Sequence, residues 1–203
     1  MWDERYSREE FVYGKDPNDF LREQVTMLPV GRTLCLAEGE GRNAVFLATR
    51  GHRVTAVDWS LVGLEKARRL AQERNVRIET VHTDLSHFRI EPESWNAIIS
   101  IFAHVPPPLR RVLHREAVAG LVPGGVFLLE AYTPEQLKYN TGGPPAEEMM
   151  MTLETLQAEL DGLEWLHAEE SVREVREGEF HHGEGAVVQL IGRKPAPGVQ
   201  PAG

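Results

Sequence analysis

Short apolar runs rich in β-branched residues alternate along the chain with segments whose apolar residues recur at helical spacing. Five of these runs predict strands, at residues 33–36, 53–57, 78–81, 97–101 and 126–130. Segments with helical spacing follow three of them, at about residues 43–50, 61–71 and 109–121. Apolar strands separated by helices are typical of a parallel sheet that is covered by helices on both faces.

The pattern changes after residue 130. Residues 133–145 predict a loop that contains a short helix, and residues 152–160 predict a helix. Two further apolar runs, 165–175 and 186–192, are joined across residues 178–185 without a helix, which predicts antiparallel neighbours. We therefore expect an α/β fold, a three-layer Rossmann-like sandwich with a mostly parallel seven-stranded sheet whose last strand is antiparallel.

The length of 203 residues fits a single domain. We expect this domain to span residues 1–194, including an N-terminal helical segment at 1–30, and to be followed by a flexible tail at 195–203. The hydrophobic share of 41% and the charged share of 26% are those of an ordinary folded protein.

The formal net charge of −9 argues against a nucleic-acid partner, because phosphate binding needs clustered Lys and Arg. The arginines within 68–74 and 110–115 alternate with apolar residues, so they predict solvated helix faces. The one cysteine, Cys35, allows no disulfide framework and no thiolate metal site. The sequence starts without a signal-peptide pattern and has no membrane-spanning run, so we expect a cytoplasmic monomer or homodimer.

Candidate site residues follow the first four predicted strands. In an open parallel sheet, ligands bind outside the carboxyl ends of the strands. These loops contain glycines, carboxylates and apolar side chains, a mixture that suits a nucleoside with a positively charged extension: Glu38, Gly39, Glu40, Gly41, Asp58, Trp59, Asp84, Leu85, Phe102 and His104.

Two features of these loops point to a nucleoside. Gly39 and Gly41 let the backbone approach a ligand closely, although a tight strand-to-helix turn without a ligand is an equal interpretation. Asp58 ends the second strand, where a carboxylate can accept both hydroxyl protons of a ribose. Its alternative role is a helix cap, but Ser60 already supplies one.

A nicotinamide dinucleotide is the rival ligand for this arrangement. Glu38 and Glu40 argue against it, because their negative charge would repel a pyrophosphate and attract a sulfonium or ammonium group. The antiparallel pair at the C-terminal end of the sheet also differs from an all-parallel dinucleotide fold.

The motifs resemble those of the class I S-adenosylmethionine-dependent methyltransferases. The resemblance rests on residues 34–41, Asp58, residues 83–85 and the turn at 121–125, and it runs from about residue 32 to residue 194. Residues 2–6, 13–14, 17–21 and 41–44 are similar to small bacterial methyltransferases related to the tellurite-resistance and thiopurine types.

One departure from the family concerns the first motif. Cys35 and Ala37 stand where the family has an acid and then its first glycine, so the acid has in effect moved to Glu38. We expect Glu38, with backbone carbonyls of the loop, to meet the cofactor's ammonium group.

The resemblance implies roles for the other candidates. Asp58 would hold the ribose hydroxyls, Trp59 would lie against the adenine, Asp84 would accept from the adenine amino group and Leu85 would add a contact. Phe102 and His104 would lie near the transferable methyl group. Tyr13 and the N-terminal segment would cover the site as a lid that excludes water.

Methyl transfer from a sulfonium is an in-line displacement that needs alignment more than a nucleophile on the protein. His104 is the candidate general base if the acceptor must lose a proton, and packing after the fourth strand is its alternative role. Their position at and after the end of the fifth predicted strand places Glu130 and Tyr132 at the acceptor side. Residues 149–151, three methionines, would line an acceptor pocket or, as we prefer, fill gaps in the core.

No metal site is expected, because His181 and His182 lie in a predicted exposed turn without a defined ligand spacing. The sequence therefore predicts an S-adenosylmethionine-dependent methyltransferase for a small-molecule acceptor, such as a thiol or a chalcogen oxyanion. The alternatives are a non-catalytic sensor or scaffold that binds the nucleoside cofactor and, ranked below it, an NAD-binding oxidoreductase.

Overall fold

The computed structural model describes residues 2–139, 141–144, 146–177 and 181–196. Seven strands form one sheet in the order β3-β2-β1-β4-β5-β7-β6. All neighbours pair in parallel except β7, which is antiparallel to both β5 and β6. The expected mostly parallel, seven-stranded sheet with an antiparallel last strand is confirmed. The strands are β1 (Arg32–Leu36), β2 (Arg53–Asp58), β3 (Glu79–His82), β4 (Trp95–Ile101), β5 (Leu121–Tyr132), β6 (Glu164–Glu177) and β7 (His181–Arg193).

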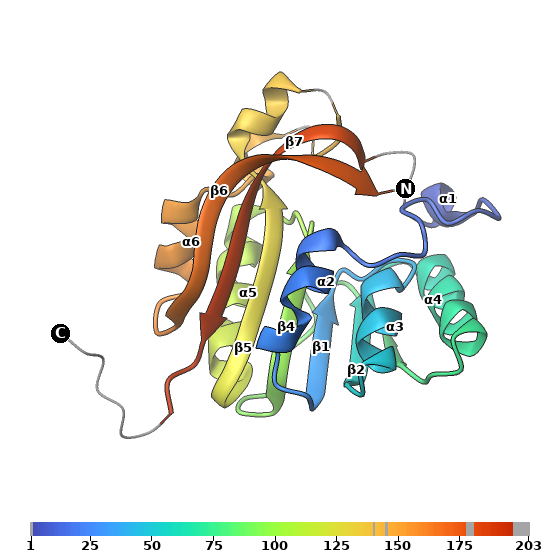
Figure 1. Cartoon of the computed structure of the whole chain (residues 1–203), viewed down its shortest axis with the longest axis horizontal. Coiled ribbons are helices and arrows are strands. Elements are labelled where there is room, and N and C mark those ends of the chain that lie inside the picture. Colours follow the sequence, from blue (N-terminus) through green and yellow to red (C-terminus); the bar gives the residue numbers. More distant parts are fainter. Residues whose placement is uncertain (1, 140, 145, 178–180, 197–203) are drawn as a thin grey trace.

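Helices cover both faces of the sheet, as Figure 1 shows. One face carries α2 (Asp19–Gln24), α3 (Arg42–Thr49) and α4 (Leu61–Glu73), and the other carries α5 (Pro107–Gly120) and α6 (Leu153–Glu159). The remaining helical elements are α1 (Trp2–Tyr6) and the short η1 (Val25–Met27), η2 (Pro134–Lys138) and η3 (Glu147–Met149). No helix among the described residues is long and apolar enough to cross a membrane.

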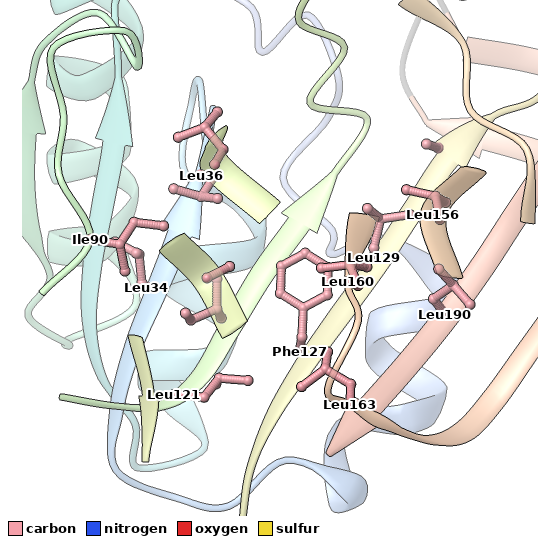
Figure 2. Packing of buried hydrophobic residues seen from close by; sticks show 14 of the residues in the cluster. Leu34, Leu36, Ile90, Leu121, Phe127, Leu129, Leu156, Leu160, Leu163 and Leu190 are labelled. Carbon is pink, nitrogen blue, oxygen red and sulfur yellow. The ribbon is translucent and has the colours of Figure 1, made fainter. Parts of the chain in front are cut away.

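The alternation of side chains along β1 explains why both faces are apolar. Leu34 and Leu36 pack into the core beneath α5 and α6, whereas Cys35 points into the core beneath α2, α3 and α4. Successive residues of a strand face opposite sides, so a strand that is buried on both sides is apolar throughout. Figure 2 shows the first of these cores, in which Phe127 of β5 packs against Leu160 of α6.

Several strands differ from the expected ranges, most of all β5, which begins at Leu121 rather than at residue 126 and so includes the residues expected to form a turn. β3 lies one residue later than predicted, and no helix follows it before β4. β7 begins at His181 rather than at 186, and β6 extends to Glu177, so the hairpin is longer than its apolar pattern indicates. The extra pairs, such as Glu174 with Glu184, contain polar residues, which hydrophobic alternation alone cannot detect.

The N-terminal segment divides into two parts. Phe20 and Leu21 of α2 and Leu28 are buried in the sheet's core, so residues 18–30 form part of the domain itself. Residues 2–17, which we call the lid segment, run over the loop after β1, with α1 packed against α4. Residues 197–203 of the expected tail lie outside the described residues.

Candidate functional site

In the loop between β1 and α3, three alternate residues have left-handed backbone angles. Ala37, Gly39 and Gly41 have φ angles of 50°, 59° and 88°. Glycine adopts such angles at little cost, whereas alanine is strained there. Ala37, which stands where the resemblance implies a glycine, therefore has a backbone angle that glycine adopts readily.

The two glycines are needed for different reasons. A Cβ at Gly39 would lie 2.6 Å from the hydroxyl of Tyr6, which belongs to the lid segment. A Cβ at Gly41 would lie 2.4 Å from the Cβ of Ala67 in α4. Gly41 is therefore required by the close approach of α4 and by its positive φ, and its approach to a ligand stays a prediction.

Asp58 links the ends of β1 and β2. Its Oδ2 accepts a hydrogen bond of 2.8 Å from the N–H of Gly39, and its Oδ1 accepts one of 2.7 Å from the N–H of Ser60. Burial raises the pKa of this carboxyl above its usual range. A carboxylate offers about four acceptor positions. The two bonds to the backbone thus fix the side chain and leave acceptor capacity for hydroxyl donors.

Glu38 points into the same loop and caps α3. Its Oε1 accepts a hydrogen bond of 2.7 Å from the N–H of Ala44. Burial raises the pKa of Glu38 to about 7, and the nearby Asp58 adds to the rise, while Arg42 and the N–H groups of the helix oppose it. The carboxyl also hydrogen-bonds with the buried thiol of Cys35. That this carboxyl takes the place of the acid expected from the resemblance stays a prediction.

Glu40 has its carboxylate directed away from the glycine turns. It pairs with Lys66 of α4 and accepts from the N–H groups of Val12 and Tyr13 in the lid segment. Both oxygens are therefore engaged with protein groups, and contact with a cofactor stays a prediction for this residue.

The lid segment covers the loop with a buried aromatic ring. Tyr6 lies between Gly39 and Gly63, where a Cβ on Gly63 would come within 3.1 Å of the Tyr6 ring. Its ring packs against Trp2 at 5.6 Å and edge-on against Tyr13 at 6.4 Å. The hydroxyl of Tyr13 accepts a hydrogen bond from Arg5. The covering role was expected for Tyr13 and the N-terminal segment as a whole, and Tyr6 is the residue of that segment whose ring is buried against the glycine loop.

The residues expected around an adenine lie at the ends of β2 and β3. Trp59 is 64% exposed, so its indole is open to a ligand. Its carbonyl oxygen lies 2.9 Å from Nε2 of His82. Asp84 accepts from Ser86, which lowers the pKa of this carboxyl, and Leu85 is buried in the core. Their predicted contacts with adenine stay predictions.

Three rings stack where β4 and β5 end. Phe102 packs on Tyr132 with ring centroids 4.6 Å apart, and Tyr132 packs on His104 at 5.8 Å. Phe102 has a φ of 50°, an unusual angle for a bulky residue that is often found at functional sites.

His104 has backbone partners on both ring nitrogens. Its Nε2 accepts from the N–H of Tyr132 at 3.3 Å, and its Nδ1 lies 3.0 Å from the carbonyl oxygen of Met149. These contacts fix a neutral ring protonated at Nδ1, because a carbonyl can only accept. Action as a general base would require one of these bonds to break, so the geometry favours a positioning role, and the catalytic role stays a prediction.

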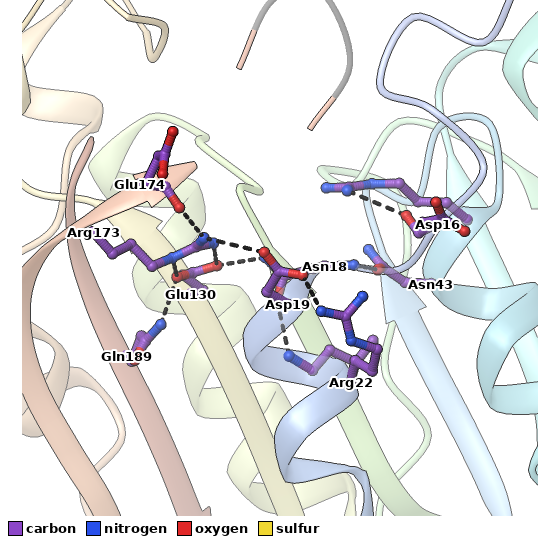
Figure 3. A network of polar contacts seen from close by, with 11 residues as sticks. Asp16, Asn18, Asp19, Arg22, Asn43, Glu130, Arg173, Glu174 and Gln189 are labelled. Atoms are coloured by element: carbon purple, nitrogen blue, oxygen red, sulfur yellow. Dashed lines mark hydrogen bonds and ion pairs between the residues drawn. The ribbon is translucent and has the colours of Figure 1, made fainter. Parts of the chain in front are cut away.

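Glu130 is fully buried in a polar network rather than open on the acceptor side. It forms two hydrogen bonds of 2.7 Å with the guanidinium of Arg173, and it also accepts from Gln189 and Asn18 (Figure 3). Arg173 lies 3.9 Å from Asp19 at the start of α2. The network therefore joins β5, β6 and β7 to the N-terminal part of the domain.

A second buried ion cluster supports the methionine segment. Glu159 of α6 binds Arg110 and His114 of α5, and Arg110 also donates to the carbonyl oxygen of Met150. Met150 and Met151 are buried, which agrees with the preferred role of these methionines as core residues. No group of three potential metal-binding side chains occurs among the described residues, which exclude Glu179 and the side chains of His181 and His182.

The loops described above belong to a segment with a recognisable family pattern. Residues 34–125 match the family model of a methyltransferase domain. The matched segment runs from β1 to the start of β5 and so contains the glycine loop, Asp58, Asp84 and the end of β4. Among curated proteins, no sequence matches this chain.

Solved structures with a similar fold include several methyltransferases. TehB from Haemophilus influenzae is 19% identical with a TM-score of 0.70, and the match covers 87% of this chain and 61% of TehB. The N-methyltransferase NodS from Bradyrhizobium japonicum WM9 is 16% identical with a TM-score of 0.66, and 95% of each chain is covered. An S-adenosylmethionine-dependent methyltransferase from Clostridium acetobutylicum ATCC 824 is 16% identical with a TM-score of 0.65, with 88% of this chain and 90% of that chain covered.

Identities this low establish a shared fold. The family model adds the pattern of a methyltransferase domain over residues 34–125, which is less than half of the chain. The acceptor and the roles of single residues are separate questions.

Proposed function

We propose that this protein is an S-adenosylmethionine-dependent methyltransferase that acts on a small-molecule acceptor. The observation that carries the proposal is the geometry of Asp58. Its carboxylate is fixed by the N–H groups of Gly39 and Ser60 at the junction of two parallel strands, inside the segment that matches the methyltransferase model. A carboxylate held in this place with acceptor capacity to spare suits the hydroxyl pair of a ribose.

The rest of the loop suits the charged end of the cofactor. S-adenosylmethionine supplies a methyl group on a cationic sulfur, and displacement of that sulfur is favourable when the acceptor is aligned with it. Glu38 provides a carboxylate in the loop for a cationic group. A cation that binds nearby stabilises the ionised form of this carboxyl. Tyr6 and Tyr13 cover the loop and exclude water.

In this proposal, the rate acceleration comes from aligning the acceptor with the methyl group of the cofactor. Effective molarities for well-oriented groups correspond to about 7–11 kcal/mol, which is enough to make a general base unnecessary for acceptors that are already nucleophilic. Thiols, small amines and oxyanions of selenium or tellurium are the classes to screen. The amines are included because NodS, a structure with a similar fold, is an N-methyltransferase.

Calorimetry with S-adenosylmethionine and with its demethylated product tests the proposal. We expect both to bind, and we expect Asp58→Ala to weaken binding at least tenfold. Asp161→Ala is the matched control, because Asp161 is an exposed acid in the turn between α6 and β6. Absence of binding at millimolar ligand, or equal affinities for the two variants, would refute the proposed site.

A sensor or scaffold that binds the cofactor without turnover is the alternative function. The departure at Cys35 and Ala37 is the observation that favours it. Transfer of labelled methyl to any acceptor of the screen decides for the enzyme, and tight binding without transfer to any of them decides for the sensor.

A further inference from the structure

One buried ion pair lies outside the apolar clusters of the sheet and joins the glycine loop to α4. Lys66 of α4 and Glu40 of the glycine loop are joined at 2.6 Å, and their side chains are 1% and 3% exposed. Such a pair is retained at a desolvation cost, so each remaining donor and acceptor needs a partner. The partners here come from the lid segment.

The two members of the pair contact neighbouring residues of the lid segment, Lys66 at residues 10 and 11 and Glu40 at residues 12 and 13. Lys66 donates a second hydrogen bond, of 2.7 Å, to the carbonyl oxygen of Glu10, and its Nζ lies 5.3 Å from the centre of the Phe11 ring. Glu40 accepts from the N–H of Val12 at 2.8 Å and from the N–H of Tyr13 at 3.4 Å. The pair therefore holds residues 10–13 directly against the glycine loop.

The lid segment must move if a nucleoside is to reach the loop. The hydroxyl of Tyr6 lies on Gly39, and Gly39 is the residue whose N–H is bound by Asp58. Under the proposed function, the ribose meets this same Asp58. Entry and exit of the cofactor therefore require residues 2–13 to lift away from it.

The chain beyond residue 13 is fixed much more firmly. Asn18 is fully buried, donates from its N–H to Asn43 at 2.9 Å and from its amide to Glu130, and accepts from the N–H of Leu21 (Figure 3). Between residues 10–13 and Asn18 lies Gly14, with a φ of 74°. A glycine at this point gives the chain freedom to turn about a fixed end.

We propose that Glu40 and Lys66 are positioning residues for cofactor binding, whose ion pair fastens residues 10–13 over the bound cofactor and releases them for exchange, while Asn18 stays anchored. This inference rests on the proposed function. It also changes the expected role of Glu40, which acts on the cofactor through the lid segment.

The test replaces the pair as a unit, because removing one partner would leave a buried charge and risk unfolding. Glu40→Met/Lys66→Met removes both charges at similar volume. The matched control is Lys15→Met/Glu73→Met, which removes an exposed ion pair between the same lid segment and the same helix α4. Thermal unfolding of both variants checks that each is folded.

Two measurements are made on each folded variant. The first is the dissociation rate of labelled S-adenosylmethionine, chased with excess unlabelled ligand. The second is hydrogen exchange of the Val12 and Tyr13 amides in the free protein. We expect the dissociation rate and the exchange rate of Glu40→Met/Lys66→Met to be at least five times those of the control variant. A smaller ratio of variant to control in either measurement overturns the proposal. A partly unfolded variant would bind less ligand, but the dissociation rate constant of its folded fraction would stay unchanged, so this rate constant separates the proposed role from a general loss of structure, which also speeds amide exchange.

The two proposals fail in different ways. If the wild-type protein binds no S-adenosylmethionine, the proposed function fails and the positioning role fails with it, whatever the exchange rates are. If the wild-type protein binds the cofactor but Glu40→Met/Lys66→Met releases it no faster than the control does, only the role of the ion pair is refuted.

Discussion

The carboxylate of Glu38 accepts a 2.7 Å hydrogen bond from the N–H of Ala44, in the first turn of α3. Despite this bond, burial raises the pKa of Glu38 from 4.5 to about 7. The folded protein therefore holds a proton on Glu38 in a pH range where the unfolded chain has released it. The free energy of unfolding depends on pH wherever the two states bind different numbers of protons.

The first prediction concerns stability against pH. Because the folded state binds more protons between pH 4.5 and about 7, the contribution of Glu38 to the free energy of unfolding falls as pH rises through this range. One pKa unit corresponds to about 1.4 kcal/mol, so the fall reaches about 3 kcal/mol. Glu38→Gln keeps an acceptor for Ala44 and removes the titration. Urea unfolding of both proteins at several pH values measures the difference, and parallel curves would contradict the raised pKa.

The second prediction concerns the pH dependence of affinity. The positive sulfur and ammonium groups of the cofactor stabilise the ionised form of Glu38. Below about pH 7 a proton must leave Glu38 on binding, so the wild-type affinity for S-adenosylmethionine should fall by up to tenfold per pH unit. Calorimetry should show a much flatter profile for Glu38→Gln. The demethylated product keeps the ammonium group and lacks only the sulfonium charge, so its affinity should follow the same pH dependence if Glu38 meets the ammonium group. Equal profiles for wild type and variant would exclude Glu38 from the cationic site.

A third prediction follows from the left-handed backbone of Ala37, at a φ of 50°. An L-residue is strained at this angle and glycine is not, although glycine also makes the unfolded chain more flexible. We expect Ala37→Gly to raise the free energy of unfolding by up to about 1 kcal/mol. Ala48→Gly, inside α3, should lower it by about the same amount. Destabilisation by both glycines would show that Ala37 is not strained.

The fourth prediction separates the two roles of His104. Its nitrogens contact the backbone of Tyr132 and Met149, so His104→Gln, which keeps a donor and an acceptor, should lower kcat less than about tenfold. Loss of a general base would lower kcat by a factor of about 10² to 10⁴ and alter the pH profile of kcat. The comparison is made with any acceptor found in the screen.

The fifth prediction concerns Glu159. Burial would raise the pKa of Glu159, but hydrogen bonds from His114 and Arg110 outweigh it and lower the pKa to about 2. Its stabilising contribution is therefore present above pH 4.5 and is lost as pH falls toward 2. Glu159→Gln at pH 7 should lower the free energy of unfolding by about 3–5 kcal/mol, because the Arg110 charge stays buried without its partner.

Glu164→Gln is the control for this cluster. Glu164 forms an exposed ion pair with Arg193, and such pairs contribute less than about 1 kcal/mol. Denaturant unfolding measures both variants. Equal losses of unfolding free energy in the two variants would mean that the buried ion pairs of Glu159 stabilise the protein no more than an exposed ion pair does.

Much of the fold could be predicted from local pattern. β1, β2 and α4 were expected within one or two residues, because their apolar residues follow one period and Ser60 caps the helix. Asp58 was also placed correctly at the end of β2, since parallel strands bring their carboxyl ends together. The start of β7 at His181 was missed because polar residues at that end of the hairpin carry no periodic signal.

The directions of the side chains could not be predicted. Glu38 and Glu40 are two residues apart in one loop, yet one caps α3 and the other reaches Lys66, 26 residues away. Glu130 was placed at the acceptor side on position alone, but it is buried and pairs with Arg173, which comes from β6. Such partners depend on tertiary packing, which hydrophobic period and loop position do not encode.

Gly63 lies inside α4, where glycine weakens a helix by roughly 0.5–1 kcal/mol relative to alanine. A methyl group there would meet the carbonyl of Gly39 at 3.0 Å and the ring of Tyr6 at 3.1 Å. Positions 6 and 63 are therefore expected to change together during evolution. A homologue with alanine at position 63 should have lost the tyrosine at position 6 as well. The substitution Gly63→Ala, intended to stabilise α4, would displace the Tyr6 ring that covers the glycine loop.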